Sequence, residues 1–168
     1  KIKSKVQQNV NLIHKIRRWQ GNLSALENTK KPVICAIHGL CIGSGMDLIT
    51  AADIRVGTVD SKYSNRESKI AIVADLGTLQ RVQRTMHLGK AREMVYTGGD
   101  YSAQEMKEAG FLNNTFETYD AMIRHTYDLA ASIAANSPLV VQASKQMLNY
   151  AYDHSVEEGL DRVAIWNT

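Results

Sequence analysis

Three carboxylates in the middle of the chain have the residue types and surroundings that proton transfer needs. Asp47 lies in the apolar segment 46–49 and Asp75 in the apolar segment 72–76, with Glu67 between them in the chain. Carboxyl groups in apolar surroundings have raised pKa values, which suits general acids and bases near neutral pH. Spacing alone also allows a structural interpretation, in which Asp47 and Asp75 cap helices and Glu67 pairs with Arg66.

A glycine-rich turn directly precedes the first of these acids. Glycines stand at positions 39, 43 and 45, between an apolar run and a second apolar segment. In Gly43-Ser44-Gly45, backbone N–H groups at the start of a helix would be left unpaired and would suit an anion or a developing oxyanion. The alternative is a tight turn that needs glycine only for its backbone freedom. The spacing is not the dinucleotide-binding fingerprint, because Leu48 stands where the third glycine is required.

Composition and residue usage exclude several other classes of function. Twenty Lys and Arg against seventeen Asp and Glu leave a net charge of +3, and the cations do not interleave with aromatic residues as in a nucleic-acid-binding stripe. No apolar run approaches the roughly 20 residues of a membrane span. Cys35 and Cys41 match no zinc pattern and cannot form a disulfide framework, which favours a reducing compartment. We therefore expect no bound metal, no nucleic acid and no membrane span. His38 is a weaker candidate base, because a packed histidine is the commoner case.

The order of elements in the first third indicates an α/β fold. Apolar residues recur every three or four positions over 6–26, which predicts one long amphipathic helix, and Pro32 closes it. The run 33–37 reads as a strand buried on both faces. A short helix over 46–52 follows the glycine turn, and 54–56 reads as a further strand, giving the alternation typical of an α/β protein.

The second half reads as helical. Ser102 with Glu105, and Ser155 with Glu158, have the spacing of capping boxes. Helices are predicted at 77–88, 91–96, 102–109, 118–136 and 137–152, and from 155 onward. Because no internal repeat or linker separates these elements, we expect a single domain over 1–168. The chain begins without Met, and we expect it to be an excerpt of a longer protein, truncated at both ends.

Taken together, these residues resemble the enoyl-CoA hydratase/isomerase (crotonase) family. The segments that carry the resemblance are 31–39, 41–48, 52–55, 77–81, 97–98 and 103–110. They cover nearly the whole chain from Lys31 onward. Within the family, the three acids and the segment 74–81 are most similar to the Δ3,5-Δ2,4-dienoyl-CoA isomerase subgroup.

The resemblance implies a fold, a substrate and a setting. The fold is a crotonase-type ββα spiral core, its N-terminal part missing here, followed by a helical C-terminal region. The substrate is an acyl-CoA thioester, so that no separate cofactor is needed, because CoA belongs to the substrate. The expected assembly is a homotrimer or a dimer of trimers, in the peroxisome or the mitochondrial matrix, serving the β-oxidation of unsaturated fatty acids.

The resemblance also implies roles for individual residues. Asp75 removes a proton from C2 of a 3,5-dienoyl thioester, and Glu67 delivers a proton at C6. Asp47 fixes the protonation or the orientation of Glu67. Backbone N–H groups, that of Ser44 among them with Gly45 beside it, hold the enolate oxygen. Hydratases of the family generally have two glutamates, at the positions of Asp47 and Glu67, and a small residue in place of Asp75, so the third carboxylate favours the isomerase.

Two positions depart from the family pattern, since Ser44 and Ala71 stand where relatives carry glycine. Two alternatives therefore stay open beside the isomerase. One is an enoyl-CoA hydratase or another isomerase of the family, and the other is a non-catalytic member that acts in assembly. The arrangement that would favour the isomerase is three carboxylates around one apolar pocket beside the Ser44 N–H.

Overall fold

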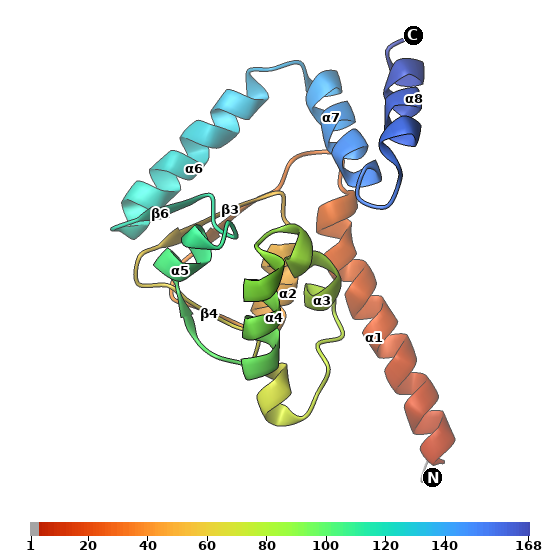
Figure 1. Cartoon of the computed structure of the whole chain (residues 1–168), viewed down its shortest axis with the longest axis vertical. Coiled ribbons are helices and arrows are strands. Elements are labelled where there is room, and N and C mark those ends of the chain that lie inside the picture. Colours follow the sequence, from red (N-terminus) through yellow and green to blue (C-terminus); the bar gives the residue numbers. More distant parts are fainter. Residues whose placement is uncertain (1–3) are drawn as a thin grey trace.

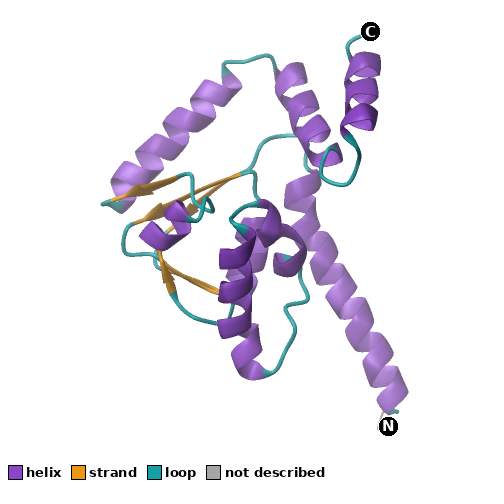
Figure 2. Ribbon diagram, viewed as in Figure 1, coloured by secondary structure: helices purple, strands orange, loops and turns teal. Residues whose placement is uncertain are grey.

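Two small sheets form the centre of the computed structural model, which describes residues 4–168. The first sheet has the order β1-β3-β6, with all strands parallel. The second has the order β2-β4-β5, with β4 and β5 antiparallel. The strands are β1 (Ile34–Ile37), β2 (Leu40–Ile42), β3 (Ile54–Thr58), β4 (Lys62–Ser64), β5 (Tyr101–Ser102) and β6 (Asn114–Phe116). From β1 to β4 the chain alternates between the two sheets and so winds as a spiral of ββα turns; β5 then stays in the second sheet and β6 returns to the first. The strands are drawn in orange in Figure 2.

Helices surround this centre and extend beyond it. They are α1 (Lys5–Asn28), α2 (Ser44–Thr50), α3 (Thr78–Arg81), α4 (Leu88–Thr97), α5 (Ala103–Glu108), α6 (Tyr119–Ala134), α7 (Pro138–Tyr150) and α8 (Val156–Trp166), with 3-10 turns η1 (Arg66–Ile70) and η2 (Val82–Arg84). Figure 1 shows α2, α3 and α4 grouped beside the strands, α1 running outward to the N-terminus, and α7 and α8 at the C-terminal end. This confirms the α/β class and the helical C-terminal region. Within residues 4–168, no helix has the length and apolarity to cross a membrane.

The local signals in the sequence located most of these elements. Helix α1 ends four residues before Pro32, as the proline predicts. Both capping boxes form, with Ser102 and Ser155 each accepting from the backbone N–H three residues later while the glutamate bonds back. At the start of α7, Ser137 takes the cap position, but its side chain makes no capping hydrogen bond.

Three expectations about the elements are wrong. Strand β1 is not buried on both faces: Ile37 is buried and Cys35 packs against the core, whereas Ala36 on the opposite face is exposed. The helix predicted over 77–88 breaks, because the N–H and hydroxyl of Thr85 both bond to the carbonyl of Val82 and end the turn there. The glycine-rich stretch is not turn alone, since it contains strand β2.

The buried core lies between the second sheet and helices α2, α4 and α5. Its largest fully buried side chains include Met46, Tyr63, Met94, Met106 and Phe111. The rings of Tyr63 and Phe111 meet edge to face at 6.3 Å between centroids, a favourable geometry for aromatic pairs. Helix α2 therefore has one firmly packed face, which fixes the position of the residues between its apolar anchors.

Helix α1 is not packed in the same way. None of its residues is buried, and the side chains of Val6, Val10, Ile13 and Trp19 are all exposed. The amphipathic pattern predicted the helix correctly, but its apolar stripe is only half-buried, at Ile16, Leu23 and Leu26, and is otherwise exposed. The helix is held mainly at its C-terminal end.

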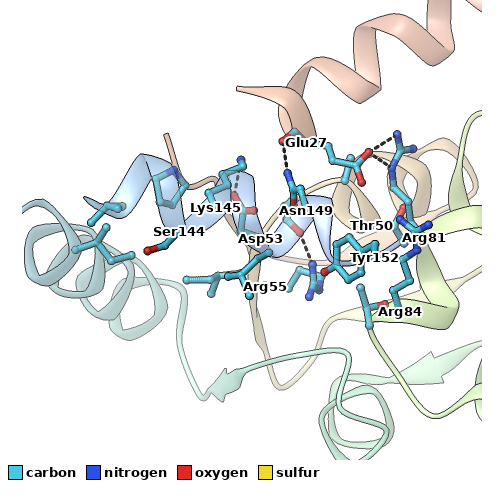
Figure 3. A pocket seen from close by; sticks show the side chains of 18 of the residues that line it. Glu27, Thr50, Asp53, Arg55, Arg81, Arg84, Ser144, Lys145, Asn149 and Tyr152 are labelled. Carbon is cyan, nitrogen blue, oxygen red and sulfur yellow. Dashed lines mark hydrogen bonds and ion pairs between the residues drawn. The ribbon is translucent and has the colours of Figure 1, made fainter. Parts of the chain in front are cut away.

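A buried lysine makes that connection (Figure 3). The Nζ of Lys145 on α7 donates to Asp53 Oδ2 at 2.7 Å and to the carbonyls of Leu26 and Lys31 at 3.2 and 3.1 Å. The same Asp53 oxygen accepts from the N–H of Val33 at 2.7 Å. One ammonium group, only 5% exposed, thereby joins α7 to the end of α1 and the start of β1.

We expect Lys145→Met to lower the free energy of unfolding by about 3 kcal/mol, because it removes the donor to the Asp53 carboxylate and to the carbonyls of Leu26 and Lys31. Urea denaturation of the purified protein measures this. The matched control is Lys90→Met, which removes a more exposed pair with Glu93 and should cost less than about 1 kcal/mol. Equal effects from the two variants would contradict the role given to Lys145.

Candidate functional site

Asp47 is the most deeply placed of the three predicted acids. It lies on α2 between the buried Met46 and the exposed Leu48, and it is only 2% exposed. Its Oδ1 accepts two hydrogen bonds from Thr78, one from the backbone N–H at 2.8 Å and one from the hydroxyl at 2.7 Å. Asp47 thus holds the start of α3, and the alternative in which Asp75 caps that helix is wrong, because α3 receives no capping bond from the residues before it.

Glu67 lies in η1, against the glycine-rich turn. Its Oε1 is 3.3 Å from the position that a Cβ on Gly43 would occupy. Its Oε2 is buried and has no hydrogen-bond partner among the described residues. The expected ion pair with Arg66 does not form, because Arg66 turns to Asp100 and binds both of its carboxylate oxygens, at 2.8 and 2.6 Å. The Glu67 carboxyl group is therefore left for another role.

The surroundings of Glu67 favour its neutral form. Burial raises its pKa first, and the charges of Asp47 and Asp75 raise it further, against a hydrogen bond from its own backbone that lowers it. Both causes make ionisation costly, since a carboxylate is poorly solvated there and has two like charges nearby. A carboxyl group that keeps its proton to higher pH is suited to act as a general acid.

Asp75 occupies a different environment from the other two acids. It is exposed, in the loop between η1 and α3, and the neighbouring Ile72 and Val73 are exposed as well. Its backbone carbonyl accepts from the side chain of Gln20 on α1 at 2.6 Å, which fixes the loop. Asp75 lies close enough to Glu67 to raise the pKa of that residue. The structure thus has one buried carboxylate, Asp47, one half-buried, Glu67, and one exposed, Asp75, and does not place the three within one apolar pocket.

Backbone conformation at Gly43 explains why the turn and Glu67 approach so closely. Gly43 has φ 57° and ψ −117°, a combination that residues with a side chain avoid. Its N–H bonds to the carbonyl of Ser64, and its carbonyl accepts from the N–H groups of Met46 and Asp47. In the described part of the chain, the N–H groups of Ser44 and Gly45 make no hydrogen bond. Ser44 is exposed, so its side chain points into open space.

Ala71, the other departure from the family pattern, adopts φ 56° and ψ 35° at the end of η1. This is the left-handed conformation that glycine adopts without a steric penalty. The preference for glycine at this position therefore has a backbone cause, which is the turn that leads from Glu67 toward Asp75.

The remaining candidate residues are less suited to catalysis or metal binding. Burial raises the pKa of the Cys41 thiol to about 12, with Cys35 adding to the shift, so Cys41 is not a nucleophile near neutral pH. His38 is exposed and lies edge-on to Tyr119 at 5.6 Å. Among residues 4–168, no group of histidine, cysteine and acidic side chains has the arrangement of a metal site.

A cavity of about 700 Å³ lies elsewhere, between α7 and the C-terminal end of α2 (Figure 3). Its lining includes Arg55, Arg81, Arg84 and Lys145 but none of the three predicted acids. Most of these cations are already engaged: Arg81 bonds to Glu27, and Arg55 and Lys145 bond to backbone carbonyls. Because none of the three acids lines it, the cavity is separate from the carboxylates.

Thr78 is the functional residue that sequence reasoning missed. It lies within the segment 77–81, which contributed to the resemblance, but a threonine at the start of a short helix gives no sign of the partner it will meet. The contact joins residues 31 positions apart. Asn65 was also missed; its side-chain nitrogen, two residues before Glu67, is buried and has no hydrogen-bond partner within residues 4–168.

Comparison with known proteins shows to which family the chain belongs. The sequence model described as enoyl-CoA hydratase/isomerase matches residues 7–164. A mitochondrial Δ3,5-Δ2,4-dienoyl-CoA isomerase of Dictyostelium discoideum is 48% identical over 98% of this chain and 56% of its own length. A peroxisomal Δ3,5-Δ2,4-dienoyl-CoA isomerase of Arabidopsis thaliana is 42% identical over 94% of this chain, again 56% of its own length. The chain therefore spans little more than half of each of these relatives.

The fold has close counterparts among solved structures. An enoyl-CoA hydratase from Bacillus anthracis superposes with a TM-score of 0.85 and 28% identity, over 95% of this chain and 60% of that one. This confirms that the ββα spiral is the crotonase-type core predicted from the sequence.

We expect Gly43→Ala to lower the free energy of unfolding by about 2 kcal/mol, because the backbone conformation excludes a Cβ that would also crowd Glu67. The control is Gly21→Ala within α1, where nothing lies within 4 Å of the new atom and a gain of about 0.5–1 kcal/mol is expected. Denaturation with urea compares them, and a destabilising effect of the same size at both positions would contradict this account of the turn.

The raised pKa of Glu67 predicts the sign of a pH effect on stability. The folded protein binds this proton more tightly than the unfolded chain, so folding loses free energy as the pH rises from the ordinary glutamate pKa, about 4.3, through the raised value. Glu67→Gln removes this loss, and the stability of the variant relative to the original protein should increase from pH 4 to pH 7.

Glu105→Gln is the control of opposite sign. Backbone and hydroxyl hydrogen bonds from Ser102 lower the pKa of Glu105, so this carboxylate stabilises the fold above its unfolded pKa and the benefit is lost as the pH falls. The Gln variant should therefore lose stability relative to the original protein as the pH rises. Parallel pH dependences for the two variants would exclude the environment described for Glu67.

Proposed function

The chain belongs to the enoyl-CoA hydratase/isomerase family, and on that basis we propose that the intact protein is a Δ3,5-Δ2,4-dienoyl-CoA isomerase. It converts 3,5-dienoyl-CoA to 2,4-dienoyl-CoA in the β-oxidation of unsaturated fatty acids. The observation that supports this most is the 48% and 42% identity to the dienoyl-CoA isomerases of Dictyostelium and Arabidopsis, over 98% and 94% of this chain. The third carboxylate, Asp75, is consistent with the same reaction, and it lies near enough to Glu67 to add to the raised pKa of that residue.

The reaction needs two proton-transfer groups at separate places. A base removes a proton from C2, and the electrons of that C–H bond delocalise along the diene and onto the thioester oxygen. An acid then adds a proton at C6, which leaves double bonds at C2–C3 and C4–C5. Because C2 and C6 are several bonds apart, two carboxyl groups serve the two ends better than one.

The environments of the two acids match these two tasks. Glu67, whose pKa is raised by burial and by neighbouring charges, supplies the proton at C6. Asp75 takes the proton from C2. After one turnover Asp75 holds a proton and Glu67 lacks one. Asp75 is exposed and Glu67 is half-buried, so Asp75 releases its proton to water and Glu67 takes one up from water before the next turnover.

The N–H of Ser44, with that of Gly45 beside it, is the proposed donor to the enolate oxygen. These groups make no hydrogen bond in the described chain and adjoin Glu67 through Gly43. Donors positioned in advance stabilise a developing oxyanion strongly. Because the Ser44 side chain is exposed, serine in place of the family's glycine leaves the backbone donor usable.

The wider setting follows from the same proposal. The substrate is an acyl-CoA thioester, and no cofactor beyond its CoA group is required. We propose a homotrimer or a dimer of trimers, built from a chain in which residues 1–168 form one domain. The location is the mitochondrial matrix or the peroxisome, as in the names of the Dictyostelium and Arabidopsis relatives.

An enoyl-CoA hydratase is the second candidate. It is favoured by the superposition on the Bacillus anthracis hydratase and by the pair of enclosed carboxylates, Asp47 and Glu67. Supplying 2-enoyl-CoA and measuring 3-hydroxyacyl-CoA tests it directly. A protein that binds acyl-CoA but turns over neither substrate would be the non-catalytic member.

The isomerase proposal predicts that Asp75→Asn lowers the rate of diene conjugation at least 100-fold, the usual effect of losing a general base. Ultraviolet absorbance of the 2,4-diene follows the reaction in the intact protein. Asp128→Asn, which removes an exposed charge on α6, should leave the rate within a factor of two. An Asp75→Asn rate also within a factor of two would refute the assignment.

A further inference from the structure

We propose that Thr78 is a positioning residue of this site, whose hydroxyl and backbone N–H together fix the Asp47 carboxylate in orientation and in charge beside Glu67. The inference rests on the proposed isomerase function and adds a residue to it. Neither the family pattern quoted above nor the roles of the three acids gives Thr78 a part in the reaction.

The contacts around Asp47 are those of a buried carboxylate whose oxygen is satisfied by hydrogen bonds from the protein. Both donors of Thr78 meet the same oxygen, Oδ1 of Asp47, at 2.8 and 2.7 Å. Thr78 is completely buried and Asp47 is 2% exposed, so water does not compete for these bonds. Burying a carboxylate is costly unless hydrogen bonds replace its hydration, and bonds to a charged acceptor are the strong ones.

The direction of the bonds favours the ionised form of Asp47. A backbone N–H can only donate, and a threonine hydroxyl facing the same oxygen donates its single proton as well. An acidic proton on Oδ1 would displace one of the two bonds. Thr78 therefore stabilises a charged Asp47, and that charge is one of the causes that raise the pKa of Glu67.

The neighbouring charged groups do not stabilise a charge on Asp47, so its stabilisation depends on Thr78. The neighbouring acids are Glu67 and Asp75, and neither brings a positive charge to Asp47. The nearest cation on α3, Arg81, bonds to Glu27 and Ser24 on α1. On the β2 side, Cys41 is a neutral thiol whose pKa is about 12.

A matched pair of variants separates positioning from packing. Thr78→Val keeps the shape of the side chain but removes the hydroxyl, whereas Thr78→Ser keeps the hydroxyl and removes a methyl group. In the intact protein we expect Thr78→Val to lower kcat about tenfold with KM within a factor of two. It should also move the alkaline limb of the kcat–pH profile to lower pH, because a weakened Asp47 charge raises the pKa of Glu67 less. Thr78→Ser should keep the original profile. Equal kcat values and pH profiles for the two variants would overturn the inference.

A second readout does not depend on activity. Thr78→Val should have a lower free energy of unfolding than Thr78→Ser, with an unfolding equilibrium constant about 5- to 30-fold larger, because it leaves the buried Oδ1 of Asp47 with one donor fewer. Equal stabilities would assign Thr78 a packing role and overturn the inference. An original protein that fails to isomerise 3,5-dienoyl-CoA, while Thr78→Val is destabilised relative to Thr78→Ser, would contradict the proposed function and support the role of Thr78.

Discussion

The site depends on one buried carboxylate. Asp47 is enclosed between α2 and α3, and its charge is compatible with burial only because two donors from Thr78 replace the lost water. The same contact joins two elements 31 residues apart. Fold and chemistry are therefore linked at one point, because the bonds that attach α3 to α2 also hold a negative charge beside Glu67.

The other features of the site allow the charge of Asp47 to lie next to a second acid, Glu67. Gly43 permits Glu67 to approach the turn, since a side chain there would meet its carboxyl oxygen. Asp100 binds Arg66, the residue next to Glu67 in the chain. A cation paired with Glu67 would favour its ionised form, so the Arg66–Asp100 pair is compatible with the raised pKa of Glu67. Asp75 lies exposed on the following loop, so the three acids differ in their contact with solvent.

Local signals in the sequence predicted those helices whose formation depends on interactions between residues close together in the chain. Apolar periodicity located α1, and the capping boxes at Ser102 and Ser155 located the starts of α5 and α8. The exposure of Ala36 and the three-residue strand β2 depend on which elements lie opposite, and no local pattern encodes that. The charges of Asp47 and Asp75 both act on Glu67, but the hydrogen-bond partners in this region were not predicted. Thr78 and Asp100 lie 31 and 34 positions from the residues they bind, beyond the reach of spacing arguments.

The most direct test of this account is the titration of the Glu67 side chain itself. In protein with ¹³C-labelled glutamate carboxyl groups, the Glu67 signal should titrate above the ordinary glutamate pKa, about 4.3. Asp47→Asn should move this titration toward lower pH, because it removes the neighbouring charge while keeping an oxygen for Thr78. A Glu67 signal that titrates at or below the ordinary value, or one that Asp47→Asn leaves unmoved, would contradict the central claim.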